Sequence, residues 1–454
     1  MRVRGAVLRE MGLPSPYAES QPLTIEELEL APPGPGELLV RIHAAGLCHS
    51  DLSVIDGSRP RVMPMLLGHE ATGEVLQSES PDFTPGDTVS LAFVPSCGTC
   101  GPCAEGRAAL CEPGAAANTA GTLLTGTRRL STPTAGTNTP RTPTNTLSDR
   151  PHTPTTPTNT LSDRPNAPTT PTNNPADRPS TPTTPTNNPA DRPSTPTTRT
   201  NSQAGRLDDS SDQSGRADVH HHLGVSGFAD HAVVSARSAV RIDPSLPPQI
   251  AALFGCAVMT GVGAVVNTAR VQAGQGAVVF GLGGVGLSAL LGAALVGAHP
   301  LIAVDVVPEK LSLALELGAT HAIDARSNDV VEQIKDATNG GAHYAFETVG
   351  SAAVLGQAYA ATRRGGTTVT VGLPHPSQLL SIPAVSLVAE ERTLKGSYLG
   401  SAIPSRDIPR YIALYQAGRL PVDRLLTSTV RLESLNEAFD TLAAGTSIRQ
   451  VLVL

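Results

Sequence analysis

The chain lacks an excess of basic residues. Its 454 residues include 33 lysines and arginines against 40 aspartates and glutamates, which gives a formal charge of -7. This balance argues against a nucleic acid or another polyanion as a partner. With 39% hydrophobic residues the chain can form at least two cores, and its length favours two or three domains.

The first residues also lack the apolar run of a signal peptide. MRVRGAVLREMG carries three arginines and a glutamate, which predicts a cytoplasmic protein. One later stretch, residues 277–304, has no fixed charge and is long enough to cross a bilayer. Because GLGGVG interrupts it and Asp305 follows at once, we interpret it as strand, glycine turn, helix and second strand.

Cysteine is scarce, yet four of the six cysteines fall in CGTCGPCAEGRAALC, residues 97–111. Disulfides are rare in a reducing cytoplasm, and thiols at such short spacing more often hold a metal. Four thiolates complete a zinc tetrahedron and leave no position for substrate. We therefore predict a structural zinc site made by Cys97, Cys100, Cys103 and Cys111.

The remaining two cysteines lie in different motifs. Cys48 stands in AAGLCHSDL, His69 follows in LLGHEATGEV, and Cys256 stands far downstream in LFGCAVMTGVGAV. Two thiolates and one imidazole on zinc leave a fourth position for water or substrate, which is the catalytic arrangement. Taken singly, each cysteine could equally be a small buried hydrophobe, and His69 a histidine of the core.

A glycine motif follows in AVVFGLGGVGLSALLGAALVGAHPLIAVDVV. Gly281, Gly283 and Gly286 have the G-x-G-x-x-G spacing, between an apolar strand and a helix, and an acid follows 19 residues later, as a dinucleotide site requires. That acid, Asp305, would accept hydrogen bonds from ribose hydroxyls and repel a 2'-phosphate. We therefore predict NAD rather than NADP; the alternative is a solvated aspartate at the end of a strand.

Together, CHSD, GHEATG, the four-cysteine segment and the glycine motif resemble the zinc-containing medium-chain alcohol dehydrogenase family, within the medium-chain dehydrogenase/reductase superfamily. The resemblance covers residues 1 to about 130 and about 218 to 454. It implies an α/β chain with a GroES-like, β-rich catalytic domain and a Rossmann domain built on a doubly wound parallel sheet.

The expected boundaries place the first part of the catalytic domain in residues 1–257, with the structural zinc lobe in 95–112. The Rossmann NAD-binding domain takes 258–398, and 399–454 return to the catalytic domain. Alternating strand and helix signals between 277 and 372 fit a parallel sheet. RLESLNEAFDTLAAG predicts a late helix whose apolar stripe belongs to the core.

The resemblance also implies roles for residues around the cofactor. Lys310 would face the ribose, His49 and Arg449 would approach the pyrophosphate, and Val285 and Thr260 would pack against the nicotinamide. A homodimer or homotetramer is expected on the same ground.

Near the predicted catalytic zinc, chemistry assigns further roles. The metal would bind the alcohol oxygen and a hydride would pass to the nicotinamide. Ser50, two residues after a ligand, would first take the departing proton. Family members often continue this relay to a histidine where this chain has Ser53, so water or His49 would have to finish it. Ser53 itself is better explained as a turn residue.

Three neighbouring residues complete the predicted site. Asp51 would orient His69 through the second ring N–H, its alternative being a helix cap. By resemblance, Glu70 would approach the zinc only transiently, and Phe93 is expected to line the substrate pocket.

The chain departs from the family between about residues 131 and 217. Here 14-residue units such as TPTNTLSDRPHTPT repeat from Thr142 to Thr197. Proline and threonine dominate and no apolar face exists, which predicts a disordered repeat insertion with local polyproline character. We favour a tolerated tandem expansion over a functional tail. The HHH at 220–222 is expected to be solvated rather than to bind a metal.

Three functions fit these observations. The leading hypothesis is an NAD-dependent zinc alcohol dehydrogenase with two zinc ions per chain, acting on a small-molecule alcohol or aldehyde. The second is a thiol-dependent formaldehyde dehydrogenase of the same family, and the third a catalytically silent scaffold that carries the repeats. Seven intact presumed zinc ligands argue against silence, because a scaffold needs no open three-ligand site.

Overall fold

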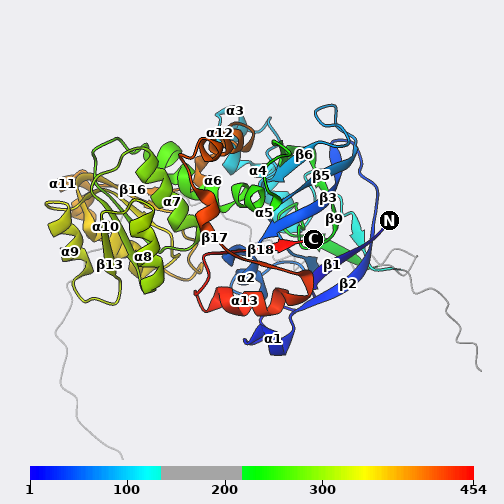
Figure 1. Ribbon diagram of the computed structural model, residues 1–454, viewed down its shortest axis with the longest axis horizontal. Helices are drawn as coiled ribbons and strands as arrows, with labels where there is room; N and C mark the ends of the chain where they lie inside the picture. The colour runs from blue at the N-terminus through cyan, green and yellow to red at the C-terminus, as the bar shows by residue number, and fades with distance from the viewer. Residues whose placement is uncertain (134–216) are drawn as a thin grey trace, which may run out of the picture. The chain divides into compact units, whose positions relative to one another are not determined.

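The computed structural model of the protein describes residues 1–133 and 217–454 (Figure 1). The predicted disordered repeat insertion therefore lies almost wholly outside the described residues. The described chain forms a β-rich part and a parallel sheet flanked by helices, which confirms the predicted fold class.

The β-rich part contains a small closed barrel and a larger mixed sheet. In β2 (Leu23–Leu30), leucines at both ends are buried while Glu27 is exposed and faces the arginines of β1 (Arg2–Leu8). This alternation lets one face pack on the core while the other meets water. The barrel order is β1-β2-β7-β8-β4, with β4 (Met65–Leu66), β7 (Leu130–Ser131) and β8 (Asp218–His221).

The larger sheet has the order β10-β6-β5-β3-β18-β17, and β9 also pairs with β3. Both chain regions of the predicted catalytic domain contribute, because the last strand of the chain pairs antiparallel with β3. The strands are β3 (Glu37–Gly46), β5 (Ala71–Ser78), β6 (Thr88–Leu91), β9 (His231–Ser235), β10 (Ala239–Arg241), β17 (Leu426–Val430) and β18 (Arg449–Val453).

The parallel sheet has the order β13-β12-β11-β14-β15-β16, which is the doubly wound Rossmann order. Its central strand, β11 (Ala277–Phe280), is entirely buried, because helices cover both faces. The other strands are β12 (Leu301–Asp305), β13 (His321–Asp324), β14 (Ala342–Glu347), β15 (Thr362–Thr370) and β16 (Thr393–Gly396).

Helices connect these strands and pack on the sheets. Those of the parallel sheet are α7 (Gly284–Leu295), α8 (Pro308–Glu316), α9 (Val330–Ala337), α10 (Ala352–Ala361) and α11 (Ala384–Ala389). The others are α1 (Tyr17–Ser20), α2 (His49–Ile55), α3 (Gly101–Ala104), α4 (Glu112–Ala120), α5 (Pro248–Ala251), α6 (Ala257–Gly263), α12 (Pro404–Gln416) and α13 (Leu435–Ala443). The apolar stripe of α13 is buried, as the sequence predicts.

The uncharged stretch 277–304 forms β11, α7 and β12, as interpreted from the sequence. In the part of the chain that the structure describes, no single helix is long and apolar enough to cross a membrane. One bent pair, Pro248–Gly255 with Ala257–Ala269, has the required length and composition. Most of its residues are buried, many of them in the largest core cluster.

The two ends of the predicted insertion meet in the barrel. Strands β7 and β8 pair antiparallel, with Leu130 opposite Val219. The backbone N–H of Thr132 donates to the carbonyl of Ala217 at 2.9 Å. The ordered ladder thus extends to the first and last residues of the span predicted as insertion.

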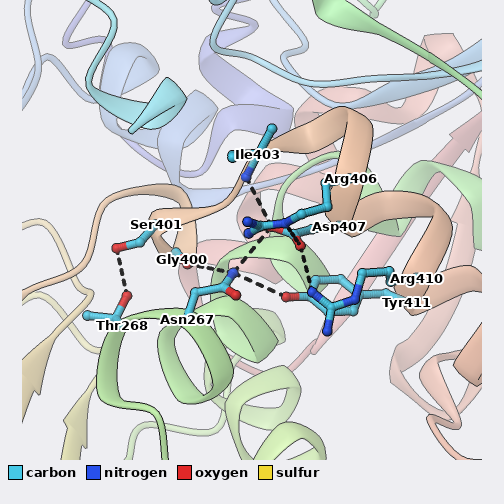
Figure 2. A network of polar contacts seen from close by, with 9 residues as sticks. All are labelled: Asn267, Thr268, Gly400, Ser401, Ile403, Arg406, Asp407, Arg410 and Tyr411. Atoms are coloured by element: carbon cyan, nitrogen blue, oxygen red, sulfur yellow. Dashed lines mark hydrogen bonds and ion pairs between the residues drawn. The ribbon is translucent and has the colours of Figure 1, made fainter. Parts of the chain in front are cut away.

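A polar network joins the chain leaving the parallel sheet to the helix that follows Cys256 (Figure 2). Asp407 on α12 is fully buried, and its carboxylate accepts hydrogen bonds from Arg406 at 2.8 Å and from the N–H of Ile403 at 3.0 Å. Asn267, in the π-helical turn Ala264–Ala269 that extends α6, donates to Asp407 and to the carbonyl of Gly400, each at 3.3 Å. The crossing between the two parts is therefore fixed to α6.

Candidate active site

The four cysteines of residues 97–111 come together in one lobe. Their sulfurs all lie within 4.8 Å of one another; the four residues are Cys97, Cys100, Cys103 and Cys111. All four are free thiols, so no disulfide links them. The loop wraps around this point because Gly98 adopts a φ of +80°, and because α3 begins after Cys100 and α4 after Cys111.

Backbone N–H groups point at these sulfurs. The sulfur of Cys97 accepts hydrogen bonds from the N–H groups of Thr99 and Cys100, at 3.4 and 3.3 Å. These bonds lower the pKa of Cys97 to about 6. The sulfur of Cys111 accepts from the N–H groups of Cys97 and Gly114. Four sulfurs this close, with donors that stabilise thiolate charge, suit a closed zinc tetrahedron.

The second cluster is assembled from three distant segments. Cys48 follows β3 and precedes α2, His69 stands between β4 and β5, and Cys256 precedes α6. Their ligand atoms lie within 4.8 Å of one another, and all three side chains are buried. The structure thus brings together the three residues predicted to hold the catalytic zinc.

The donor set fits a zinc ion. Nε2 of His69 is fully buried and has no hydrogen-bond partner in residues 1–133 and 217–454. An unpartnered buried nitrogen is costly, and a metal held with the two thiols would satisfy it. Because only three protein ligands converge here, a zinc bound by them would keep one position open.

Behind His69, a buried carboxylate joins two histidines. Asp51 Oδ2 lies 3.0 Å from Nδ1 of His69, and Oδ1 lies 3.0 Å from Nδ1 of His222. Oδ1 also accepts the N–H of Gly68 at 3.2 Å. Burial opposes ionisation of Asp51, but the two histidines outweigh it and lower its pKa. Asp51 therefore contacts the ring of His69, and no side-chain cap hydrogen bond forms at α2.

The prediction that residues 220–222 are solvated is wrong. His220, His221 and His222 are 8%, 0% and 1% exposed. They belong to β8 and the turn after it, where the closed barrel leaves no free surface around them. The contact between His222 and Asp51 could not be found from local sequence, because it depends on the pairing of β8 with β4.

Glu70 forms a buried ion pair next to the cluster. Its carboxylate contacts Nη2 of Arg449, while Nη1 of Arg449 donates to the carbonyl of Leu47 at 3.1 Å. Burial raises the pKa of Glu70 to about 7 against the opposing charge of Arg449. The stem of Arg449 packs on Gly284 at the start of α7, so this arginine links the metal cluster to the glycine loop.

One cleft of about 450 Å³ contains most of the remaining predicted residues. His69 and Asp51 lie behind its wall, fully buried. The cleft is lined by Cys48, His49, Ser50, Phe93, Cys256, Thr260, Gly281, Gly283, Val285, Gly286, Asp305, Lys310 and Arg449.

The glycine loop has the geometry that a dinucleotide needs. Gly281 has a φ of +88°, and a Cβ on Gly286 would lie 1.8 Å from the carbonyl oxygen of Gly281. A Cβ on Gly283 would meet nothing within 4 Å, so the backbone there is open to a ligand. Asp305 ends β12 and its carboxylate accepts the N–H groups of Leu282 and Val307, at 2.6 and 2.9 Å.

Two serines of α2 differ in what their hydroxyls reach. Oγ of Ser50 lies 3.8 Å from the sulfur of Cys48, at the metal cluster. The hydroxyl of Ser53 donates to the carbonyl of Ser50 at 3.0 Å. Both serines line the cleft, but Ser53 lies inside α2 and bonds to its own helix, so the prediction that it is a turn residue is wrong.

Comparisons with known proteins agree with this geometry. Residues 34–136 match the alcohol dehydrogenase GroES-like domain and residues 284–417 match the zinc-binding dehydrogenase domain. The chain is 33% identical to the NDMA-dependent alcohol dehydrogenase of Amycolatopsis methanolica, over 100% of this chain and 99% of the relative. It is 32% identical to the geraniol dehydrogenase of Castellaniella defragrans, over 99% and 97%.

Among solved structures, the benzyl alcohol dehydrogenase of Acinetobacter calcoaceticus superimposes with a TM-score of 0.76 and 26% identity, over 100% of this chain and 99% of that one. These matches span both parts of the fold. The chain therefore belongs to the zinc-containing medium-chain alcohol dehydrogenase family, a family of oxidoreductases.

Proposed function

We propose that the protein is an NAD-dependent zinc alcohol dehydrogenase that interconverts an alcohol and its aldehyde. The observation that supports this most is that one cleft is lined both by the thiols of Cys48 and Cys256 and by the glycine loop. Relatives named for geraniol, benzyl alcohol and alcohols in general support a small-molecule alcohol as the substrate.

We assign one zinc to each cysteine cluster. When bound, zinc at Cys48, His69 and Cys256 supplies a Lewis acid for the substrate oxygen, and NAD supplies the hydride acceptor. Asp51 holds the ring of His69 in orientation. Ser50 takes the proton that the alcohol loses and passes it to water or His49. Phe93 packs against the carbon skeleton of the substrate.

The test of this function is NAD-linked turnover by purified protein whose zinc content has been measured. We expect two zinc ions per chain and reduction of NAD with benzyl alcohol or geraniol. Turnover of formaldehyde only in the presence of a thiol would favour the formaldehyde dehydrogenase instead. A zinc-loaded protein that oxidises no alcohol, neutral or charged, would favour the scaffold.

Cofactor preference depends on Asp305. Its carboxylate is held at the end of β12 by two backbone N–H groups and lines the cleft, where it would meet the adenosine ribose. We expect NAD to be used in preference to NADP, and Asp305→Ala to reduce that preference at least about tenfold, since one charged contact contributes this much. Asp324→Ala, at the end of neighbouring β13, is the matched control. Better use of NADP by the unmodified enzyme would contradict the assignment.

We also infer a homo-oligomer. Strand β16 forms an edge of the parallel sheet in the described chain, and exposed apolar side chains lie just before and within α11. Leu379, Val385 and Val388 are 87%, 71% and 81% exposed, a patch that a second copy would cover. Light scattering on purified protein tests this: a monomer at micromolar concentration would contradict it.

A further inference from the structure

Arg59 stands at the wall of the cleft and Arg61 two residues further along the chain, and neither has a partner for its charge in the described residues. Arg59 and Arg61 lie on the segment between α2 and β4, and Arg59 lines the cleft. Nη2 of Arg59 donates one long hydrogen bond, 3.4 Å, to the carbonyl of Pro374. Nε of Arg61 is buried and has no hydrogen-bond partner in the described chain.

No carboxylate of residues 1–133 or 217–454 lies within 4.0 Å of either guanidinium, although other arginines have such partners. The acid on the same segment, Asp56, instead accepts the N–H of Ser58 at 2.8 Å. Burial lowers the pKa of Arg59, and the charge of Arg61 lowers it further. Two half-buried like charges without a counter-ion destabilise the free protein, and a bound anion would relieve this cost.

The charges of both arginines act on Tyr398, which is the last of a row of aromatic rings that begins at the metal cluster. The ring of Phe93 is 5.4 Å from that of His69, and the ring of Tyr398 is 6.0 Å from that of Phe93. Phe93, Tyr398 and Arg59 all line the same cleft. A substrate whose hydroxyl reached Cys48 and Cys256 would therefore lie along Phe93 and Tyr398, with its far end toward Arg59.

The other cations of the cleft lie beside the glycine loop and Asp305. Arg449 packs on Gly284 of the glycine loop and is already paired with Glu70. Lys310 lies on α8, directly after Asp305 and its strand. These residues lie at the expected position of the dinucleotide, which leaves Arg59 available to the substrate.

We propose that the substrate is an alcohol or aldehyde that carries an oxyanion, such as a carboxylate, at the end remote from the reacting carbon, and that Arg59 binds this anion with Arg61 beside it. A guanidinium suits this task because its planar N–H donors match the two oxygens of a carboxylate. The inference rests on the proposed dehydrogenase function and names the substrate class for it.

Matched alcohols test the proposal. The holoenzyme is assayed with NAD and either para-hydroxymethylbenzoate or its neutral analogue para-methylbenzyl alcohol. A second pair, 6-hydroxyhexanoate and hexanol, changes the distance between the hydroxyl and the carboxylate. We expect kcat/KM to be at least about tenfold higher for the charged member of one pair, the size of one charged hydrogen bond. Arg59→Gln should remove this preference and Arg59→Lys should restore part of it. Arg128→Gln, which removes an arginine paired with Asp218 on the barrel, should retain it.

Three results would overturn the proposal: equal or better use of the neutral alcohols, an Arg59→Gln variant that keeps the preference, or one that changes only the KM for NAD. A binding measurement separates this failure from failure of the proposed function. If neither alcohol is oxidised, calorimetric titration of the zinc-loaded protein with benzoate still applies. Binding that Arg59→Gln weakens at least about tenfold supports the anion site, and its absence refutes it.

Discussion

The two cysteine clusters differ in how the chain makes them. The four-cysteine lobe is built within 15 consecutive residues, and its sulfurs are held by N–H groups of the same loop. The three-residue cluster needs strands β3, β4 and β5 and helix α6 to be in place before its ligands meet. One site can thus form locally, whereas the other exists only in the folded protein.

The two cysteine clusters also differ in how far they are exposed to solvent. Cys97, Cys100 and Cys103 are partly exposed, while Cys48, His69 and Cys256 are buried and backed by the carboxylate of Asp51. A partly exposed, fully coordinated metal stabilises a loop, and a buried metal with one open position can act on a substrate. The comparison therefore predicts different responses when ligands are removed.

The largest effect is expected for Cys48→Ser. Loss of one of three ligands should lower kcat/KM at least about a thousandfold, because a Lewis acid contributes several kcal/mol to such a reaction. Melting temperature should change little, and one zinc per chain should remain, in the four-cysteine lobe. Activity assay, calorimetry and elemental analysis of the same preparation measure all three.

Cys100→Ser should show the opposite pattern. Without its fourth thiolate the lobe loses zinc, and the melting temperature should fall by about 5 °C or more, the shift expected for roughly 2 kcal/mol. Protein that remains folded should keep the zinc at Cys48 and most of its turnover. If the two serine variants gave the same profile, the division into a structural and a catalytic site would be wrong.

A smaller effect is expected when the residues that hold the ring of His69 in place are changed. His222→Phe removes one partner of Asp51 and should weaken zinc at the buried cluster about tenfold to a hundredfold, as changes behind a metal ligand do. Chelator competition measures this. His222→Asn, whose amide N–H can replace the imidazole N–H, should recover part of the affinity. Release of zinc from the four-cysteine lobe by either variant would contradict this role.

The smallest effect is expected from shortening the chain between β7 and β8. Because Thr132 and Ala217 are already hydrogen-bonded, a short turn containing Asn-Gly can replace residues 134–216. Both zinc ions and turnover should be retained, and the free energy of unfolding should not fall, because a shorter loop costs less entropy to close. Loss of either zinc or of cooperative melting would show that the removed residues are structural.

Local patterns made much of the fold predictable. The Gly281 motif and its strand and helix follow from spacing and periodicity, since the turn, the helix start and Asp305 lie within 25 residues. The four-cysteine lobe is readable for the same reason. The ligand set of Cys48, His69 and Cys256 required resemblance to a family, because nothing in the separate motifs says that they meet.

What the sequence could not give depends on contacts between distant strands. The burial of His222 arises from the pairing of β8 with β4, which brings it to Asp51. Three histidines next to a proline- and threonine-rich tract have the composition of a solvated segment. They are buried because β8 is a strand of the closed barrel. Likewise, Arg59 and Arg61 are ordinary charges in sequence, and only the absence of an acid around them in the described chain makes them informative.

The network around Asp407 also holds helix α6 in place, through the π-helical turn that extends this helix. Cys256 stands at one end of this helix and Asn267 at the other, about 16 Å away at the usual rise per residue. The helix thus carries a predicted metal ligand at one end and is held by hydrogen bonds at the other. Asp407→Asn would weaken the contacts of Asn267 and Ile403 at one end of the helix, and the sulfur of Cys256 at the other end would then be held less firmly.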